Sequence, residues 1–421
     1  MTESDPAEIA RRDRTRAPGG AGDDRDRIAR SQSTRSVRRS LLRWSILLAL
    51  GLLLPWIAER QPQLVERLYS KLLFPPIATA LGWIGSIAPF SIAQIVVLLL
   101  AIALLLSLAV LTNRLLRRDR VGLLRWSRGA MACLAILVWT FELAWGLQYA
   151  RPPLASRLQL SEVEPTPERL ASLTRWLAED ANRSHDMAVR TGEIVPLSGD
   201  DDAARQPSNG TSQRFPIEEE DLLAALSRAY RSVEPSMRDV PFSAPKRPRA
   251  AGKLLSRLGI SGIYFPFTGE ATVNALLPPI SFPFTAAHEM AHQRGIARED
   301  EANFLAFLAC REAGFWYTRY AGSLGAYLRV RRALWKAEPD SVRSMGELLG
   351  EGPQADVQTI RDFWARYEGP ATAVAEQVND TYLKANRQEA GVASYDLMVR
   401  ILVAFQEDGL LDSRSGPATL R

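Results

Sequence analysis

Cysteine and histidine are scarce in this sequence, which limits the metal and disulfide sites that it can build. Only two cysteines, Cys133 and Cys310, occur among 421 residues. One lies in an apolar run, so the pair supplies neither a disulfide framework nor a cysteine zinc site. We interpret Cys310 as a buried small residue. The histidines are His185, His288 and His292. We interpret His185 as a surface residue beside a polar insertion.

The sequence also lacks a stripe of basic residues interleaved with aromatic ones. Its net charge is +5 and its pI about 9.3, yet much of the basic excess flanks apolar runs, as in "RSVRRSLLR" and "NRLLRRDRVGLLRWSR". Arginines in such places are typical of membrane topology signals. We therefore expect a lipid bilayer as a partner and no nucleic acid.

Three apolar runs, at about 44–58, 90–112 and 129–149, predict transmembrane helices. They form a membrane domain over 41–150, after a disordered Arg/Asp-rich tail over 1–40. Arginines cluster before the first run and between the second and third, so the positive-inside rule predicts a cytoplasmic N-terminus. Everything after Tyr149 then lies outside. Trp139, Trp145 and Tyr149 suit the outer interface. Glu142 is either functional or packed near the headgroups.

The remaining residues, 151–421, predict an outer domain of class α+β that is mostly helical. Aromatic and β-branched residues in 261–278 predict a small edge-strand hairpin that turns at Thr268–Gly269. A polar stretch at about 187–215 predicts a disordered insertion. Helices are expected at 166–184, 217–233, 298–312, 323–336, 356–368, 371–387 and 393–407.

The stretch "FTAAHEMAHQRG", residues 284–295, carries the clearest chemistry. On a helix His288 and His292 share one face, and Glu289 projects beside them. This HExxH spacing predicts two zinc ligands and a general base, Glu289, for a water molecule that zinc acidifies. Most of the neighbouring residues are uncharged, although Arg294 departs from that pattern.

A catalytic zinc needs a third protein ligand and an open position. No histidine follows His292, so a carboxylate is expected, and 298–312 offers Glu299, Asp300 and Glu301. On a helix Glu299 shares a face with small and polar residues that suits close packing, whereas Glu301 shares its face with leucines. We therefore prefer Glu299 as the ligand, with Glu301 as the alternative.

Glu299-x-x-Ala302-Asn303 resembles the glutamate-x-x-Ala/Ser-Asp pattern of the gluzincins, in which the glutamate binds zinc and the acid orients a ligating histidine. Asn303 departs from the acid of that pattern. Longer stretches resemble the DUF-3810 family of bacterial membrane proteins: "WGLQYARPPL", "GIYFPFTGEATVN", "PFTAAHEMAHQRGIAREDEANFLAFLAC" and "NDTYLKANRQEAGVASYDLMVRIL". The resemblance implies a zincin-like metallopeptidase domain behind three spans of a bacterial cytoplasmic membrane. Tyr395 is a candidate catalytic hydrogen-bond donor to an oxyanion, or a core residue. Glu270 and Asn274 either line the cleft or belong to a turn.

The leading functional hypothesis is a membrane-anchored metallopeptidase with one zinc ion per chain that hydrolyses peptide or protein substrates outside the membrane. The alternative is a zinc-binding sensor or scaffold that uses the fold for partner binding without hydrolysis. A metal-free membrane scaffold is a third hypothesis.

Overall fold

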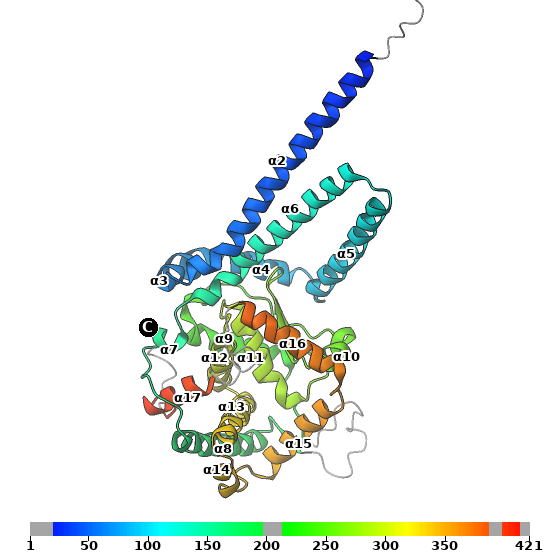
Figure 1. Cartoon of the computed structure of the whole chain (residues 1–421). Coiled ribbons are helices and arrows are strands. Elements are labelled where there is room, and N and C mark those ends of the chain that lie inside the picture. The colour runs from blue at the N-terminus through cyan, green and yellow to red at the C-terminus, as the bar shows by residue number, and fades with distance from the viewer. Residues whose placement is uncertain (1–19, 197–212, 387–397, 413–421) are drawn as a thin grey trace, which may run out of the picture. The chain divides into compact units, whose positions relative to one another are not determined.

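The computed structural model describes residues 20–196, 213–386 and 398–412, and it is mostly helical (Figure 1). The chain divides into two compact units. One contains the described residues up to Leu53 together with Leu100–Trp139; the other contains Leu54–Leu99 and the described residues from Thr140 onward. The boundary expected at 150/151 does not coincide with a boundary between these units.

Three of the described helices are long and apolar enough to cross a membrane: Arg35–Ala58 of α2 (Gly20–Ala58), α5 (Ile92–Leu116) and α6 (Arg120–Ala144). They are compatible with membrane anchoring. The third ends earlier than the expected span of 129–149, because the chain leaves the helix at Trp145. Residues 20–40 are helical, although a disordered tail was expected there. The stretch from Asp23 to Ser40 has no glycine or proline to break a helix.

Short helices next to these candidate spans belong to the second unit. Between the first two spans lie α3 (Pro62–Leu64), the π-helix η2 (Val65–Leu73) and α4 (Phe74–Ser86). After the third come the 3₁₀ helix η3 (Gly146–Ala150) and α7 (Leu154–Arg157). Phe74, Leu147 and Met237 share one buried apolar cluster, so these segments are part of the folded unit and not only linkers.

The main core of this unit surrounds two helices, α11 (Phe282–Gln293) and α12 (Glu299–Glu312). Their facing residues are small and fully buried, including Ala287, Ala291, Ala302 and Ala306. Such residues let two helix backbones approach closely. Around this pair pack α9 (Glu219–Val233), α13 (Trp316–Ala337) and α17 (Met398–Glu407), and α8 (Pro167–Arg190) packs against α13.

The predicted hairpin is present as β3 (Gly262–Phe265) and β4 (Glu270–Val273), which pair antiparallel with Gly262 opposite Val273. Gly269 adopts a φ of 66° at the turn, a conformation that glycine adopts without a steric penalty. The other edge of β4 receives a single bridge from Lys246. A second pair, β1 (Val195–Pro196) and β2 (Gln213–Arg214), flanks the part of the expected insertion that lies outside the described residues.

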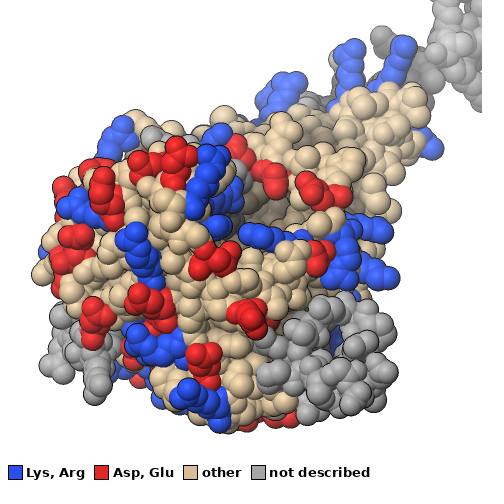
Figure 2. Space-filling view, turned by 90° about the horizontal axis from the view of Figure 1, so that it is seen from below, with Lys and Arg blue, Asp and Glu red and all other residues tan. Residues whose placement is uncertain are grey.

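The remaining elements are η4 (Pro235–Met237), α10 (Arg249–Arg257), η5 (Pro279–Ser281), α14 (Pro339–Ser344), α15 (Glu351–Ala365) and α16 (Pro370–Ala385). His185 is buried on α8 and packs against the Tyr320 ring at 5.1 Å, so its interpretation as a surface residue was wrong. On the face shown in Figure 2, acidic and basic side chains are interspersed, as on an ordinary water-exposed surface.

Candidate metal centre

Helix α11 presents His288 and His292 on one face, as the spacing predicts. Their ring centroids are 4.6 Å apart and the rings are nearly perpendicular. The helix ends at Gln293, and Gly295, two residues later, has a φ of 77° that suits the position after a helix C-terminus. The chain turns within five residues and enters α12 at Glu299.

Glu299 is the carboxylate that joins the histidine pair. Its Oε2 lies 3.1 Å from Nε2 of His288, and its Oε1 lies 3.6 Å from Nε2 of His292. One ligand atom from each of the three residues lies within 4.8 Å of the others, a cluster that could hold a metal ion. Two imidazole nitrogens and a carboxylate suit zinc with a fourth position open. The same donors suit other divalent transition ions.

The second nitrogen of each histidine has a partner that orients the ring. Nδ1 of His292 lies 2.7 Å from the carbonyl oxygen of Ile296, and Nδ1 of His288 lies 3.0 Å from Oδ1 of Asn303. An N–H at each Nδ1 that donates to these oxygens leaves each Nε2 lone pair free for a metal. Asn303 therefore stands where the gluzincin pattern has its acid. Its Oδ1 also accepts from Arg329.

The side chain of Glu289 is buried with an unsatisfied oxygen. Only 4% of this residue is exposed, and its Oε2 has no hydrogen-bond partner among the described residues. Burial raises the pKa of Glu289 to about 8. A buried carboxyl oxygen without a partner is rare in folded proteins and is typical of sites that act on a ligand.

The charges of the cluster are strongly coupled. Burial alone would raise the pKa of Glu299, but His292 and His288 hold it far below its usual range. Burial alone would lower the pKa of His292, but Glu299 raises it to about 9, whereas burial dominates and lowers the pKa of His288. A bound cation would displace the proton that Glu299 stabilises on His292, whereas the lowered pKa of His288 favours its neutral form, whose Nε2 can bind a metal.

Strand β3 passes directly beside Glu289. A Cβ atom added to Gly262 would lie 2.4 Å from Oε1 of Glu289, so any larger residue there would have to displace this carboxyl group. The backbone N–H of Asn274 donates to the carbonyl of Ser261, so these two residues form a hydrogen-bonded pair of the antiparallel ladder. Hydrogen-bonded pairs alternate with pairs that are not hydrogen-bonded. The backbone N–H and C=O of Gly262 and Tyr264 therefore point away from β4. No described strand pairs with that edge.

An aromatic wall borders the histidines, and the sequence did not reveal it. Trp145 packs edge-on against His292 at 5.4 Å and is buried with Tyr149 and Tyr264. Tyr382 of α16 accepts a hydrogen bond from Nε1 of Trp145, and its hydroxyl lies 3.4 Å from that of Tyr149. The sequence instead predicts Trp145 and Tyr149 at a lipid interface, because aromatic residues at the end of an apolar run are typical of one.

The C-terminal end of α11 rests on segments next to the candidate spans. A Cβ at Gly295 would lie 2.6 Å from Nε2 of Gln148 and 2.7 Å from Cε1 of Phe74. Arg151 donates to the Gly295 carbonyl at 3.3 Å and pairs with Glu66 at 2.7 Å, and both charged residues are buried. The position of the histidine helix thus depends on residues 66–74 and 146–151.

Arg294, the charged exception in the motif helix, has a packing role. Its guanidinium lies between the rings of Tyr230 and Phe242, 4.4 Å from each centroid, and it donates to the Met290 carbonyl. Burial lowers the pKa of Arg294 to about 10. The two rings and the carbonyl compensate part of the cost of burying this charge.

The structure gives the remaining candidates other surroundings. Glu301 accepts from the Leu154 amide at 2.9 Å and is not part of the cluster. Asn274 donates to Oγ of Ser256 on α10 and accepts from the Leu276 amide in its own turn. Glu270 is fully buried away from the histidines and accepts from the amides of Ile92 and Ala93, the first residues of α5. Tyr395 lies outside the described residues.

Comparison with known proteins gives one match. A family model described as "Protein of unknown function (DUF3810)" matches residues 69–403, which is most of the chain. No curated protein and no solved structure matches it. The matched region includes the histidine helix, Glu299, the hairpin and the aromatic wall, as well as two of the candidate spans.

Proposed function

The chain belongs to the DUF3810 family, and we propose that this member is a membrane-anchored, zinc-dependent metallopeptidase with a zincin-like domain outside the bacterial cytoplasmic membrane. The observation that carries the proposal is the buried, unpartnered Oε2 of Glu289 beside a converging His288–His292–Glu299 set. A site that only held a metal would not need this carboxyl group.

His288, His292 and Glu299 would hold one zinc ion per chain through two Nε2 atoms and a carboxylate. When bound, zinc supplies a Lewis acid that polarises the scissile carbonyl and acidifies a water molecule. The partners of both Nδ1 atoms, Asn303 and the Ile296 carbonyl, fix the ring orientations that this requires.

Glu289 acts as the general base and then as the general acid. Its carboxylate takes a proton from the attacking water and delivers it to the leaving amine nitrogen. A pKa of about 8 lets the group exchange protons near neutral pH. Because Gly262 has no side chain, the carboxyl group can lie directly beside the backbone of β3.

The open edge of β3 binds the substrate backbone. An extended peptide can add to an exposed strand edge through main-chain hydrogen bonds. The outward N–H and C=O of Gly262 and Tyr264 are available for this, and Gly262 is the residue that contacts Glu289. A peptide paired there would pass beside the general base, whatever its side chains.

The candidate spans anchor the domain. The arginines before the first span and between the second and third favour a cytoplasmic N-terminus, which leaves the site outside. The physiological substrates are then peptides or proteins at the outer face of the membrane.

The test uses the full chain purified in detergent, with zinc measured by mass spectrometry and hydrolysis measured on an unfolded labelled protein and a peptide library. We expect about one zinc per chain, and Glu289→Gln should keep the zinc and lose about 10²-fold or more of the rate. Glu312→Gln, on the exposed end of α12, is the matched control and should change neither. Unchanged hydrolysis by Glu289→Gln would refute the proposal.

One observation favours a second candidate, a zinc-binding sensor or scaffold. Asn303 is neutral and shares its oxygen with Arg329, so it gives His288 less negative support than an acid would. A zinc-loaded protein that cleaves nothing in the library yet retains a binding partner would favour this candidate.

A further inference from the structure

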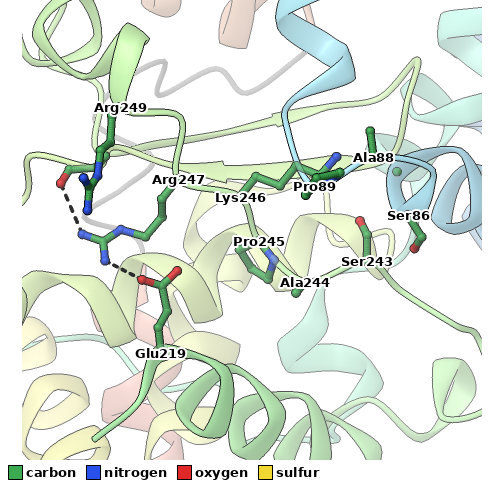
Figure 3. A pocket seen from close by; sticks show the side chains of 12 residues that line it. Ser86, Ala88, Pro89, Glu219, Ser243, Ala244, Pro245, Lys246, Arg247 and Arg249 are labelled. Atoms are coloured by element: carbon green, nitrogen blue, oxygen red, sulfur yellow. Dashed lines mark hydrogen bonds and ion pairs between the residues drawn. The ribbon is translucent and has the colours of Figure 1, made fainter. Parts of the chain in front are cut away.

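A second site lies away from the histidines, in a pocket of about 600 Å³ (Figure 3). Its walls come from the end of α4 and the residues after it, from the segment that leads into α10, and from two further residues, Glu219 and Ala275. The two segments meet through glycines. A Cβ at Gly82 would lie 2.0 Å from the Pro241 carbonyl oxygen, and one at Gly85 would lie 2.7 Å from Oγ of Ser243.

The lining is positively charged. Lys246, Arg247 and Arg249 face a single carboxylate, Glu219. Nζ of Lys246 is held by Glu270 and, at 2.7 Å, by the Phe90 carbonyl, so its charge is largely compensated. Arg247 pairs with Glu219 at 2.7 Å through Nη1 and donates to the Ala275 carbonyl through Nη2, as the dashed lines in Figure 3 show.

Two donor groups of this lining have no partner. Nε of Arg247 is buried, and no described residue accepts its hydrogen. The Arg249 guanidinium is exposed at the start of α10 and forms no ion pair or hydrogen bond in the described part of the chain. A buried N–H without an acceptor is costly, and an anionic oxygen would satisfy it. Two neighbouring guanidinium groups suit the planar, bidentate binding of phosphate oxygens.

The pocket lies close to the start of a candidate membrane span, which indicates the kind of molecule that would supply such an anionic oxygen. Pro89 lines the pocket, and the candidate span of α5 begins three residues later, at Ile92. Three residues span at most about 10 Å. Glu270 holds the first amides of that span and pairs with Lys246, so the pocket wall and the start of the span are joined.

We propose that this pocket binds the phosphate group of an anionic phospholipid from the outer leaflet. Arg249 and Nε of Arg247 bind the phosphate oxygens, and Ala88, Pro89 and Pro245 contact the apolar part of the glycerol backbone. A volume of about 600 Å³ exceeds that of a bare phosphate and lies within the range of small-molecule sites. The inference is independent of the hydrolytic proposal, but it rests on the membrane anchoring and the topology of the proposed function.

The test is titration calorimetry on the full chain in a non-ionic detergent, with short-chain phosphatidylglycerol, short-chain phosphatidylcholine and inorganic phosphate as separate probes. We expect phosphatidylglycerol to bind at least about tenfold more tightly than the other two. Arg249→Gln should weaken that binding about tenfold. Arg257→Gln, an exposed arginine at the other end of α10, loses the same charge and should leave the affinity unchanged.

Arg247→Gln should also weaken binding. If Arg247→Gln unfolds the protein because Arg247 loses its pair with Glu219, the affinity of the Arg249→Gln variant alone tests the proposal. Equal weakening by Arg249→Gln and Arg257→Gln would mean general attraction to negative charge and would overturn the proposal. Inorganic phosphate or phosphatidylcholine binding as tightly as phosphatidylglycerol would overturn it as well, the first in favour of a soluble ligand.

Discussion

Gly262→Ala tests the contact between the edge strand and Glu289. The added Cβ would lie 2.4 Å from Oε1, 2.7 Å from Cγ and 2.8 Å from Cδ of Glu289. These atoms need roughly 3.5 Å, so the carboxyl group must move by about 1 Å. A displacement of that size can cost about 10²-fold in rate. Overpacking in a buried site costs about 1–3 kcal/mol of unfolding free energy.

The zinc content should not change, because the three atoms nearest the added methyl group all belong to Glu289 and none to His288, His292 or Glu299. We therefore expect full zinc loading, a loss of about 10²-fold in hydrolysis and a lower melting temperature. The measurements are zinc per chain by mass spectrometry, initial rates on an unfolded labelled protein, and thermal unfolding in detergent. Gly369→Ala is the control, since nothing lies within 4 Å of its added Cβ.

A double variant separates this contact from a general effect on the strand. In Glu289→Ala the space that the new methyl group needs is vacant, so adding Gly262→Ala should cost little further stability. Full activity of Gly262→Ala, or the same loss of stability in both backgrounds, would refute the reasoning.

Three further predictions concern other buried groups. Burial raises the pKa of Asp356 to about 6 although Tyr320 donates to it. Folding therefore takes up a proton between about pH 4 and 6, and the free energy of unfolding should fall by about 2–3 kcal/mol as the pH rises through that window. The measurement is the free energy of unfolding as a function of pH. Asp356→Asn should remove this fall, and an unchanged slope in the variant would contradict the prediction. Glu299→Gln should lose zinc, whereas Glu301→Gln should keep it; equal zinc contents would show that Glu299 is not a ligand. Arg151→Met leaves Glu66 buried without its closest partner and should lower the unfolding free energy by about 3 kcal/mol in denaturant titration; a change below about 0.5 kcal/mol would contradict it.

The features that could be predicted from the sequence depend on the type and spacing of residues that lie close together in the chain. His288 and His292 are four residues apart, so their shared face follows from helix geometry alone. Glu299 was preferred because of the small residues on its helix face, and the structure brings it to the histidines. The hairpin turn at Gly269 likewise follows from local residue types.

The features that were missed depend on contacts between distant segments. Trp145 and His292 are far apart in the chain, and no local pattern distinguishes a tryptophan beside a metal site from one at a membrane surface. Glu270 lies in the hairpin, but the amides of Ile92 and Ala93, which donate to its carboxylate, belong to a candidate span. The contact of Gly262 with Glu289 could not be predicted from the sequence either, because a glycine has no side chain that would indicate which residue packs against it.

The support of Gly295 by Phe74, Gln148 and Arg151 has a consequence for biosynthesis. Phe74 is translated before the second and third candidate spans, and Gln148 directly follows the third. With the proposed topology, and if both spans insert as they are made, these supports reach the outer side one after the other, and the histidine helix arrives last. We therefore expect the metal site to mature only after the third span has inserted, so that newly made chains are inactive on the cytoplasmic side.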